Sequence, residues 1–289
     1  MNNFKIQKIR FTAIVFLAFS IAPFTTAIAT THSESKSAVL ITGSNRGIGL
    51  EFVRQYAALG YQVIATCRHP STADELNLLA DKFSNISVEQ MDITDADQVG
   101  LLANKYKTTP IHLLINNAAL LGTRNDQAFG SQDFGLAQQQ YAVNALGPLR
   151  VITAFIDNVR SAGPGKVITL GSAAGSNGYL RPPADFYSYR ASKAAQHFLM
   201  HNLALDLAAE NIIVGLLNPG LVDTRGLAKI GPDDPVPEDF VQILKLLRSG
   251  VLTLITPEES VTAMIKLIDE LSPEQSGIFL NYNGETLPW

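Results

Sequence analysis

Short apolar segments alternate with amphipathic segments from residue 36 onward. Seven runs rich in Val, Ile and Leu predict strands at residues 37–43, 61–67, 86–92, 111–117, 166–172, 212–218 and 276–282. Six of them suit strands buried on both faces, whereas ISVEQMD (86–92) alternates as a half-covered strand does. Residues 48–60, 72–83 and 95–106 space their apolar positions by three and four, which predicts helices, and either Thr94 or Asp95 can cap the third.

This alternation of strands and helices predicts an α/β fold. Right-handed crossovers place the strands in one central, mostly parallel, seven-stranded sheet flanked by helices on both faces. We therefore expect a single doubly wound domain over residues 36–289. The Gly- and Pro-rich stretch that starts at Pro219 interrupts the pattern, and we expect a lid loop at about residues 221–256.

The first 29 residues have a different pattern from the rest. A head with Lys5, Lys8 and Arg10 precedes an apolar run and an Ala27-Ile28-Ala29 end. These features predict a secretory signal peptide over residues 1–29, and the alternative is an uncleaved membrane anchor. Either version places the domain outside the cytoplasm, in a periplasm, an organelle lumen or the extracellular space. A buried helix of a cytoplasmic protein is the third interpretation.

Composition narrows the classes of function. The net charge of −4 is unlike the basic surface of most nucleic-acid-binding proteins, so we expect no nucleic-acid partner. Cys67 is the single cysteine, and the five histidines show no ligand spacing, so we expect neither a disulfide within the chain nor a metal site. His197 and His201, four residues apart, are interpreted as ordinary helix residues.

A glycine-rich string joins the first predicted strand to the first predicted helix. It reads T-G-S-N-R-G-I-G over residues 42–49, with glycines at Gly43, Gly47 and Gly49. Bare glycines let a backbone approach a pyrophosphate, and the N–H groups at a helix N-terminus bind it. Such a string alone could be a simple turn, but its place between a strand and a helix favours a dinucleotide site.

The string resembles the T-G-x-x-x-G-x-G of the short-chain dehydrogenase/reductase family, and other motifs follow in the family's order. Asn116-Asn117-Ala118-Ala119 matches N-N-A-G except for its last residue. Further along come Asn144, Ser172, Tyr189 with Lys193 (Y-x-x-x-K), and Pro219-Gly220. The resemblance covers about residues 38–289 and implies a Rossmann-type domain. The segments YRASKAA and NYNGETLPW are more specifically similar to the C-factor/sniffer-type carbonyl reductases.

Helical geometry distinguishes the two tyrosines near Lys193. At ~100° per residue, Tyr189 and Lys193 lie about 40° apart on one face, whereas Tyr187 and Lys193 are about 120° apart. Tyr189 is therefore the predicted acid, and Tyr187 is predicted to pack or to line a pocket. We expect the Lys193 ammonium to lower the pKa of the Tyr189 phenol from its ordinary value of about 10.

The resemblance implies reduction of a carbonyl group by hydride from a nicotinamide. Ser172 then donates a hydrogen bond to the carbonyl oxygen and Tyr189 protonates it. Lys193 also holds the nicotinamide ribose, and Asn144 holds a water that relays protons from Lys193 to solvent. A non-catalytic nucleotide-binding sensor on the same fold is the second hypothesis for function.

The residues after the second strand favour NADP(H) as the cofactor. An NAD-specific site would place an acid there, whereas this chain has Cys67 followed by Arg68. Arg68 and Arg46 suit a 2′-phosphate. By resemblance, the remaining cofactor contacts comprise the glycine string, Tyr189, Lys193 and residues that follow the later strands: Gly43, Ser44, Asn45, Gly47, Ile48, Gly49, Asp92, Ile93, Asn117, Ala118, Pro219, Gly220, Val222 and Thr224.

The resemblance also bears on partners. It implies a small-molecule carbonyl or alcohol substrate and a possible homodimer or homotetramer. No stable membrane partner is expected if the signal is cleaved.

Overall fold

The structure is a computed structural model that describes residues 37–180, 185–231, 234–236 and 238–289. The predicted signal segment, residues 1–29, lies outside the described residues. Among the residues that are described, no helix is long and apolar enough to cross a membrane.

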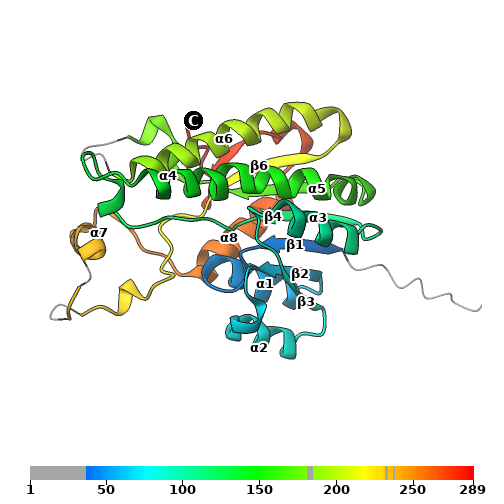
Figure 1. Ribbon diagram of the computed structural model, residues 1–289, viewed down its shortest axis with the longest axis horizontal. Helices are drawn as coiled ribbons and strands as arrows, with labels where there is room; N and C mark the ends of the chain where they lie inside the picture. Colours follow the sequence, from blue (N-terminus) through cyan, green and yellow to red (C-terminus); the bar gives the residue numbers. More distant parts are fainter. Residues whose placement is uncertain (1–36, 181–184, 232–233, 237) are drawn as a thin grey trace, which may run out of the picture. The chain divides into compact units, whose positions relative to one another are not determined.

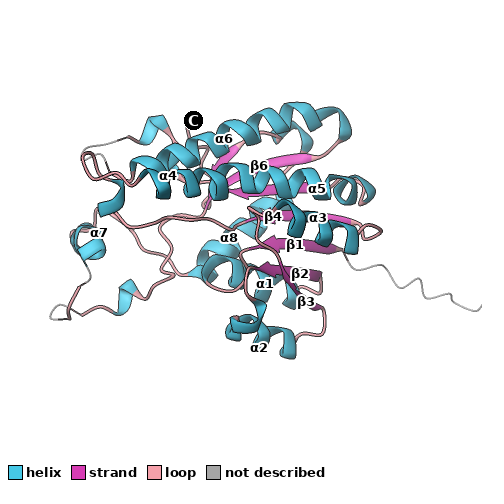
Figure 2. Cartoon of the chain, viewed as in Figure 1, coloured by secondary structure: helices cyan, strands magenta, loops and turns pink. Residues whose placement is uncertain are grey.

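A seven-stranded sheet forms the centre of the domain, in the order β3-β2-β1-β4-β5-β6-β7 (Figures 1 and 2). Every pair of neighbouring strands is parallel. The strands are β1 (Ala38–Thr42), β2 (Gln62–Cys67), β3 (Ile86–Gln90), β4 (Ile111–Asn116), β5 (Lys166–Leu170), β6 (Ile213–Asn218) and β7 (Phe279–Asn281). All seven predicted strands and the doubly wound α/β fold are thereby confirmed.

The described helices cover both faces of this sheet. Their bounds are α1 (Gly47–Ala58), α2 (Asp74–Lys82), α3 (Ala96–Lys105), α4 (Phe134–Tyr141), α5 (Gly147–Ser161), α6 (Tyr187–Leu207), α7 (Glu238–Arg248) and α8 (Pro257–Glu270). Alternate strand residues face opposite sides, so Ile41 packs in a core with α1, α2 and α8, and Leu40 in a second core with α3, α5 and α6. Two buried faces explain why most strands are apolar throughout.

Local signals set the start of α3. The Asp95 side chain accepts hydrogen bonds from the backbone N–H groups of Asp97 and Gln98, at 3.0 and 3.1 Å. Asp95, rather than Thr94, is therefore the N-cap.

Two features differ from the sequence-based expectation. The stretch expected to be a lid loop contains the helix α7, whose sequence EDFVQILKLLR repeats apolar residues at helical spacing; Leu244 in it is buried. In addition, a π-helical turn, Ala142–Leu146, joins α4 to α5. Such turns are often found at functional sites, and this one contains Asn144.

Candidate active site

The site lies where the strand order reverses. β2 and β4 flank β1 on opposite sides, so the loops that leave β1 and β4 diverge and open a crevice at the carboxyl ends of these strands. Gly43 follows β1, and Asn117 follows β4. The fold therefore places the glycine string and the N-N-A segment at one edge of the sheet.

Close packing explains two of the glycines. Gly43 has a φ of +67°, and a Cβ there would lie 2.8 Å from the Cα of Ala118. A Cβ on Gly49 would overlap the carbonyl oxygen of Gly43 and the side chain of Asn117. Both positions thus require glycine for the strand to turn into α1, and the N-terminus of a helix in this place is suited to binding a phosphate.

The Asn117 side chain holds the start of the glycine string by hydrogen bonds. Its Nδ2 donates to the carbonyl oxygens of Thr42 and Gly43, at 2.9 and 3.0 Å. Ser44 is fully buried, and its hydroxyl donates to the carbonyl of Ile41 at 2.8 Å. The Ser44 side chain therefore shapes the loop, while Asn45 and Arg46 in the same string are exposed.

The two predicted phosphate-binding arginines are exposed near this edge. Ser44 N–H donates to the carbonyl of Thr66 at 2.9 Å, which sets the glycine string beside the end of β2, two residues before Arg68. Arg46 and Arg68 are exposed, and neither has an ion-pair partner among the described residues. Two exposed guanidinium groups near the glycine string fit a cofactor that carries several phosphates.

The other predicted cofactor residues follow the carboxyl ends of β1, β3, β4 and β6. Thr224 packs on the glycine string, because a Cβ on Gly47 would lie 3.1 Å from its methyl group. Ser260 donates to the carbonyl of Pro219 at 2.7 Å, and Val222 pairs with Ile255.

After β3, Asp92 accepts from Thr94 N–H at 2.8 Å, and Ile93 is buried against Gly147. Ala118 and Gly220 pack on the string and on the Tyr282 ring, respectively, and Ile48 begins α1 beside Gly47.

Helix α6 brings Tyr189 and Lys193 to one face, as predicted. The hydroxyl of Tyr189 is hydrogen-bonded to that of Ser172, which follows β5. The Lys193 ammonium is buried and donates to the carbonyl of Leu170 at 2.8 Å and to Oε1 of Gln196 at 3.1 Å. Tyr187 points elsewhere: it is 46% exposed and lies 6.5 Å from the Phe129 ring. It also lines a cavity of about 280 Å³, which agrees with its predicted role as packing or pocket wall.

The expected lowering of the Tyr189 pKa is wrong. Burial raises the pKa of Tyr189, and the hydrogen bond from Ser172 opposes this only in part. Burial also lowers the pKa of Lys193 to about 7, so its positive charge is incomplete at neutral pH. The sequence shows the spacing of the two side chains, but the exclusion of water decides their protonation.

Asn144 is part of a buried network. Its Oδ1 accepts from Leu120 N–H at 2.7 Å, and its Nδ2 donates to Ser192 Oγ at 2.9 Å. Its backbone carbonyl accepts from Gln196 Nε2 at 2.7 Å, and Gln196 in turn contacts Lys193. The π-helical turn therefore connects Asn144 to Lys193 through Gln196, a residue that sequence reasoning missed although its spacing of three from Lys193 places it on the same helix face.

His197 is a second missed residue. Its Nε2 accepts a hydrogen bond from the Ser172 backbone N–H at 3.2 Å, and its ring lies 4.5 Å from that of Phe279. Burial, assisted by the charge of Lys193, lowers the pKa of His197 to about 3. The neutral ring can therefore act as an acceptor that holds the Ser172 backbone.

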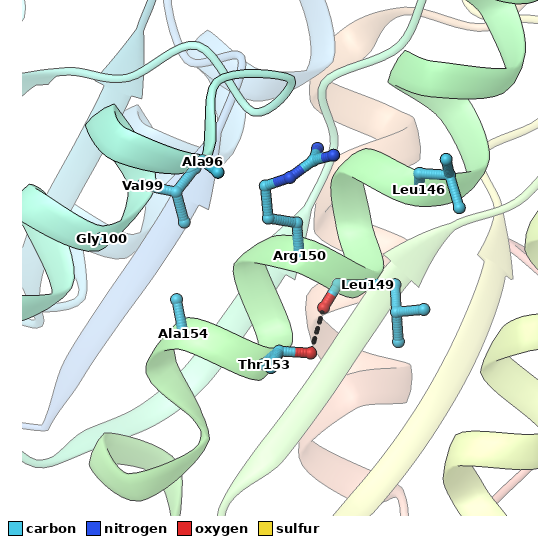
Figure 3. A pocket seen from close by; sticks show the side chains of 8 residues that line it. All are labelled: Ala96, Val99, Gly100, Leu146, Leu149, Arg150, Thr153 and Ala154. Atoms are coloured by element: carbon cyan, nitrogen blue, oxygen red, sulfur yellow. Dashed lines mark hydrogen bonds between the residues drawn. The ribbon is translucent and has the colours of Figure 1, made fainter.

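A cavity of about 410 Å³ lies between α3 and α5, away from these residues (Figure 3). Arg150 extends across it and donates to the carbonyl of Ile93 at 2.6 Å, while the rest of its lining is mostly apolar. None of the four predicted catalytic residues lines this cavity. The part of the chain that the structure describes holds no cluster of three or more His, Cys, Asp or Glu suited to a metal ion.

Comparisons with known proteins agree with this geometry. The model of a family described as short chain dehydrogenase matches residues 37–235. Short chain dehydrogenase gsfK of Penicillium aethiopicum is 33% identical over 261 residues, which cover 87% of this chain and 98% of that protein. The crystal structure of NADPH-bound carbonyl reductase from chicken fatty liver is 31% identical with a TM-score of 0.73, covering 88% of this chain and 99% of the other. Carbonyl reductase Sniffer of D. melanogaster is 25% identical with a TM-score of 0.72, covering 88% of this chain and 100% of the other.

Proposed function

The chain belongs to the short-chain dehydrogenase family of oxidoreductases, and on this premise we propose that it reduces an aldehyde or ketone to an alcohol with NADPH. The observation that carries the proposal is the contact between the Ser172 and Tyr189 hydroxyls, one helical turn from Lys193 and at the sheet edge that carries the glycine string. The similarity to carbonyl reductases, one of which is described as bound to NADPH, supports the substrate class and the cofactor.

The protonation states of this chain's residues suit reduction. When bound, a nicotinamide cofactor supplies the hydride. Because the pKa of Tyr189 is raised, its phenol is protonated at neutral pH and can donate a proton to the substrate oxygen. The Ser172 hydroxyl donates a hydrogen bond to the same oxygen as it gains negative charge. Lys193, with a pKa of about 7, can return a proton to Tyr189. Lys193 also donates a hydrogen bond to Gln196, which in turn donates to the backbone carbonyl of Asn144.

We expect the purified protein to consume NADPH when it is supplied with members of a panel of aldehydes, ketones and quinones. The measurement is the loss of NADPH absorbance together with identification of the alcohol product. A nucleotide-binding sensor, the second hypothesis for function, would bind NADPH with no turnover on any member of the panel. That result would contradict the proposed function.

Arg68→Ala is expected to raise the KM for NADPH about 10- to 100-fold, because a charge-assisted hydrogen bond to the 2′-phosphate contributes roughly 1.5–3 kcal/mol. The KM for NADH should change by no more than about twofold, since NADH lacks this phosphate. Lys107→Ala is the matched control, because it removes another exposed cation, which precedes β4 and so lies toward the amino ends of the strands. Equal increases for both cofactors would refute the proposed preference for NADP(H).

The location of the reaction is inferred from the N-terminal sequence alone. A basic head, an apolar run and an A-x-A end favour export of the domain. An exported enzyme needs a pool of NADP(H) at its destination, which favours the lumen of an organelle or another compartment that holds the cofactor. The predicted assembly into dimers or tetramers stays a prediction.

A further inference from the structure

Gln127 is a fully buried glutamine outside the four predicted catalytic residues. It ends the short 3-10 turn Asn125–Gln127, in the segment that connects β4 to α4. A buried amide costs free energy unless each of its polar atoms has a hydrogen-bond partner. The partners of Gln127 therefore indicate what its side chain holds in place.

Both ends of this amide are fully used. Nε2 donates to the backbone carbonyls of Leu121 at 2.8 Å and Thr123 at 2.7 Å. Oε1 accepts from Gln140 Nε2 at 2.9 Å, Ser188 Oγ at 3.1 Å and Tyr189 N–H at 2.9 Å. Because carbonyls only accept and a backbone N–H only donates, these partners determine the orientation of the amide.

The bond to Tyr189 N–H replaces a missing helix cap. The first N–H groups of any helix lack partners within the helix, and a side chain at the N-cap usually accepts from one of them. Phe186 occupies the N-cap of α6 with a φ of +50°, and it provides no side-chain cap. Gln127, 62 positions earlier in the chain, supplies the acceptor instead.

The same side chain joins two parts of the site. Leu120 exchanges hydrogen bonds with the Asn144 amide, at 2.7 and 2.9 Å, and the next residue, Leu121, is held by Gln127. Gly122 lets this segment pack closely, because a Cβ there would lie 2.8 Å from Leu136 and 3.0 Å from Gln127 Nε2. The segment that leaves β4 and the start of α6 are thus held as one unit.

We propose that Gln127 is a positioning residue for Tyr189: it caps α6 from outside the helix and aligns the phenol with Ser172 and the substrate oxygen. This inference rests on the proposed function, in which Tyr189 donates the proton. The hydrogen bond between Gln127 and Tyr189 goes to the backbone N–H, so the effect of Gln127 on turnover acts through the placement of the tyrosine.

Gln127→Met keeps the side-chain length and removes every hydrogen bond of the amide. We expect kcat for carbonyl reduction to fall about 10- to 100-fold, because a displacement of about 1 Å at a reacting group can cost this much. The Kd for NADPH, measured by fluorescence titration, should change by no more than about twofold. The solvent deuterium isotope effect on kcat should rise, because proton transfer from a misplaced Tyr189 becomes slower relative to hydride transfer.

Two glutamines on α4 provide the controls. Gln140→Met breaks bonds to Leu121 and to Gln127 but leaves the cap on Tyr189, so kcat should fall by less than about threefold. Gln139→Met alters an exposed neighbour and should have no effect. Equal losses of kcat in Gln127→Met and Gln140→Met, or an unchanged isotope effect in Gln127→Met, would overturn the proposal.

A measurement on the unmodified protein tests the cap even if Gln127→Met does not fold or if no carbonyl is reduced. The Tyr189 amide proton should exchange with solvent at least about 100-fold more slowly than that of Tyr187, although both lie in the first turn of α6. Equal, fast exchange at both positions would overturn the cap. Absence of turnover in a protein with a protected Tyr189 amide would instead refute the proposed function alone.

Discussion

Tyr189→Phe is expected to lower kcat for NADPH-dependent carbonyl reduction by about 10²- to 10⁴-fold, the range attributed to a general acid. The substitution removes one hydroxyl and keeps the ring, so the domain should remain folded. The glycine string, Arg46, Arg68 and Lys193 are unchanged and the Tyr189 ring is kept, so NADPH binding by fluorescence titration should be retained within about threefold. The measurement is steady-state turnover with a carbonyl substrate that the native enzyme accepts.

Tyr187→Phe is the matched control for this experiment. The two tyrosines lie two residues apart on α6, but the Tyr187 ring is 46% exposed and faces Phe129 rather than Ser172. Its turnover should stay within about twofold of the native enzyme. Near-native turnover in folded Tyr189→Phe, or a large loss in Tyr187→Phe alone, would show that the proton comes from another group.

Lys193→Met should abolish most turnover. At neutral pH it should also stabilise the folded protein, whereas most substitutions of buried residues destabilise it. Burial lowers the pKa of Lys193 from 10.5 to about 7 in the folded protein. Between these values the unfolded chain binds a proton that the folded protein does not, so the native protein loses stability as the pH falls from about 10.5 to 7. Below pH 7 this loss is constant, at roughly 5 kcal/mol.

Lys193→Met lacks this titration. The free energy of unfolding of the variant, relative to the native protein, should rise by about 1.4 kcal/mol per pH unit as the pH is lowered from 10 toward 7. Other groups titrate in both proteins and cancel in the difference. Urea unfolding at several pH values measures it, and Lys266→Met, which removes an exposed lysine on α8, should show no such slope. A difference that is independent of pH would mean that Lys193 stays charged in the folded protein.

Features that depend on neighbours in the chain were predictable from the sequence. The apolar runs predicted seven strands, because a strand covered on both faces needs apolar residues throughout. The spacing of Tyr189 and Lys193 predicted a shared helix face, because helical geometry alone sets that angle. The glycine string was recognisable because it stands between a predicted strand and a predicted helix.

Features that depend on distant contacts were not predictable. The acceptor for Tyr189 N–H is Gln127, and the acceptor for Ser172 N–H is His197, at separations of 62 and 25 residues. No local pattern marks either residue, since Gln127 lies in a polar segment and His197 in an ordinary helix. The helix α7 did have a local signal, but the glycines and prolines before it favoured a loop.

The sequence by itself determined which strands form, that they are parallel, and which side chains can share one face of α6. These properties follow from the period of the strand and of the helix, which each short segment carries within it. Only the tertiary structure decided the protonation of the site residues and the hydrogen bonds from Gln127 and His197 that hold them. Packing of α6 on the sheet buries Lys193 and partly buries Tyr189, which lowers the pKa of the lysine and raises that of the tyrosine, because the cost of burying a charge depends on everything that surrounds it.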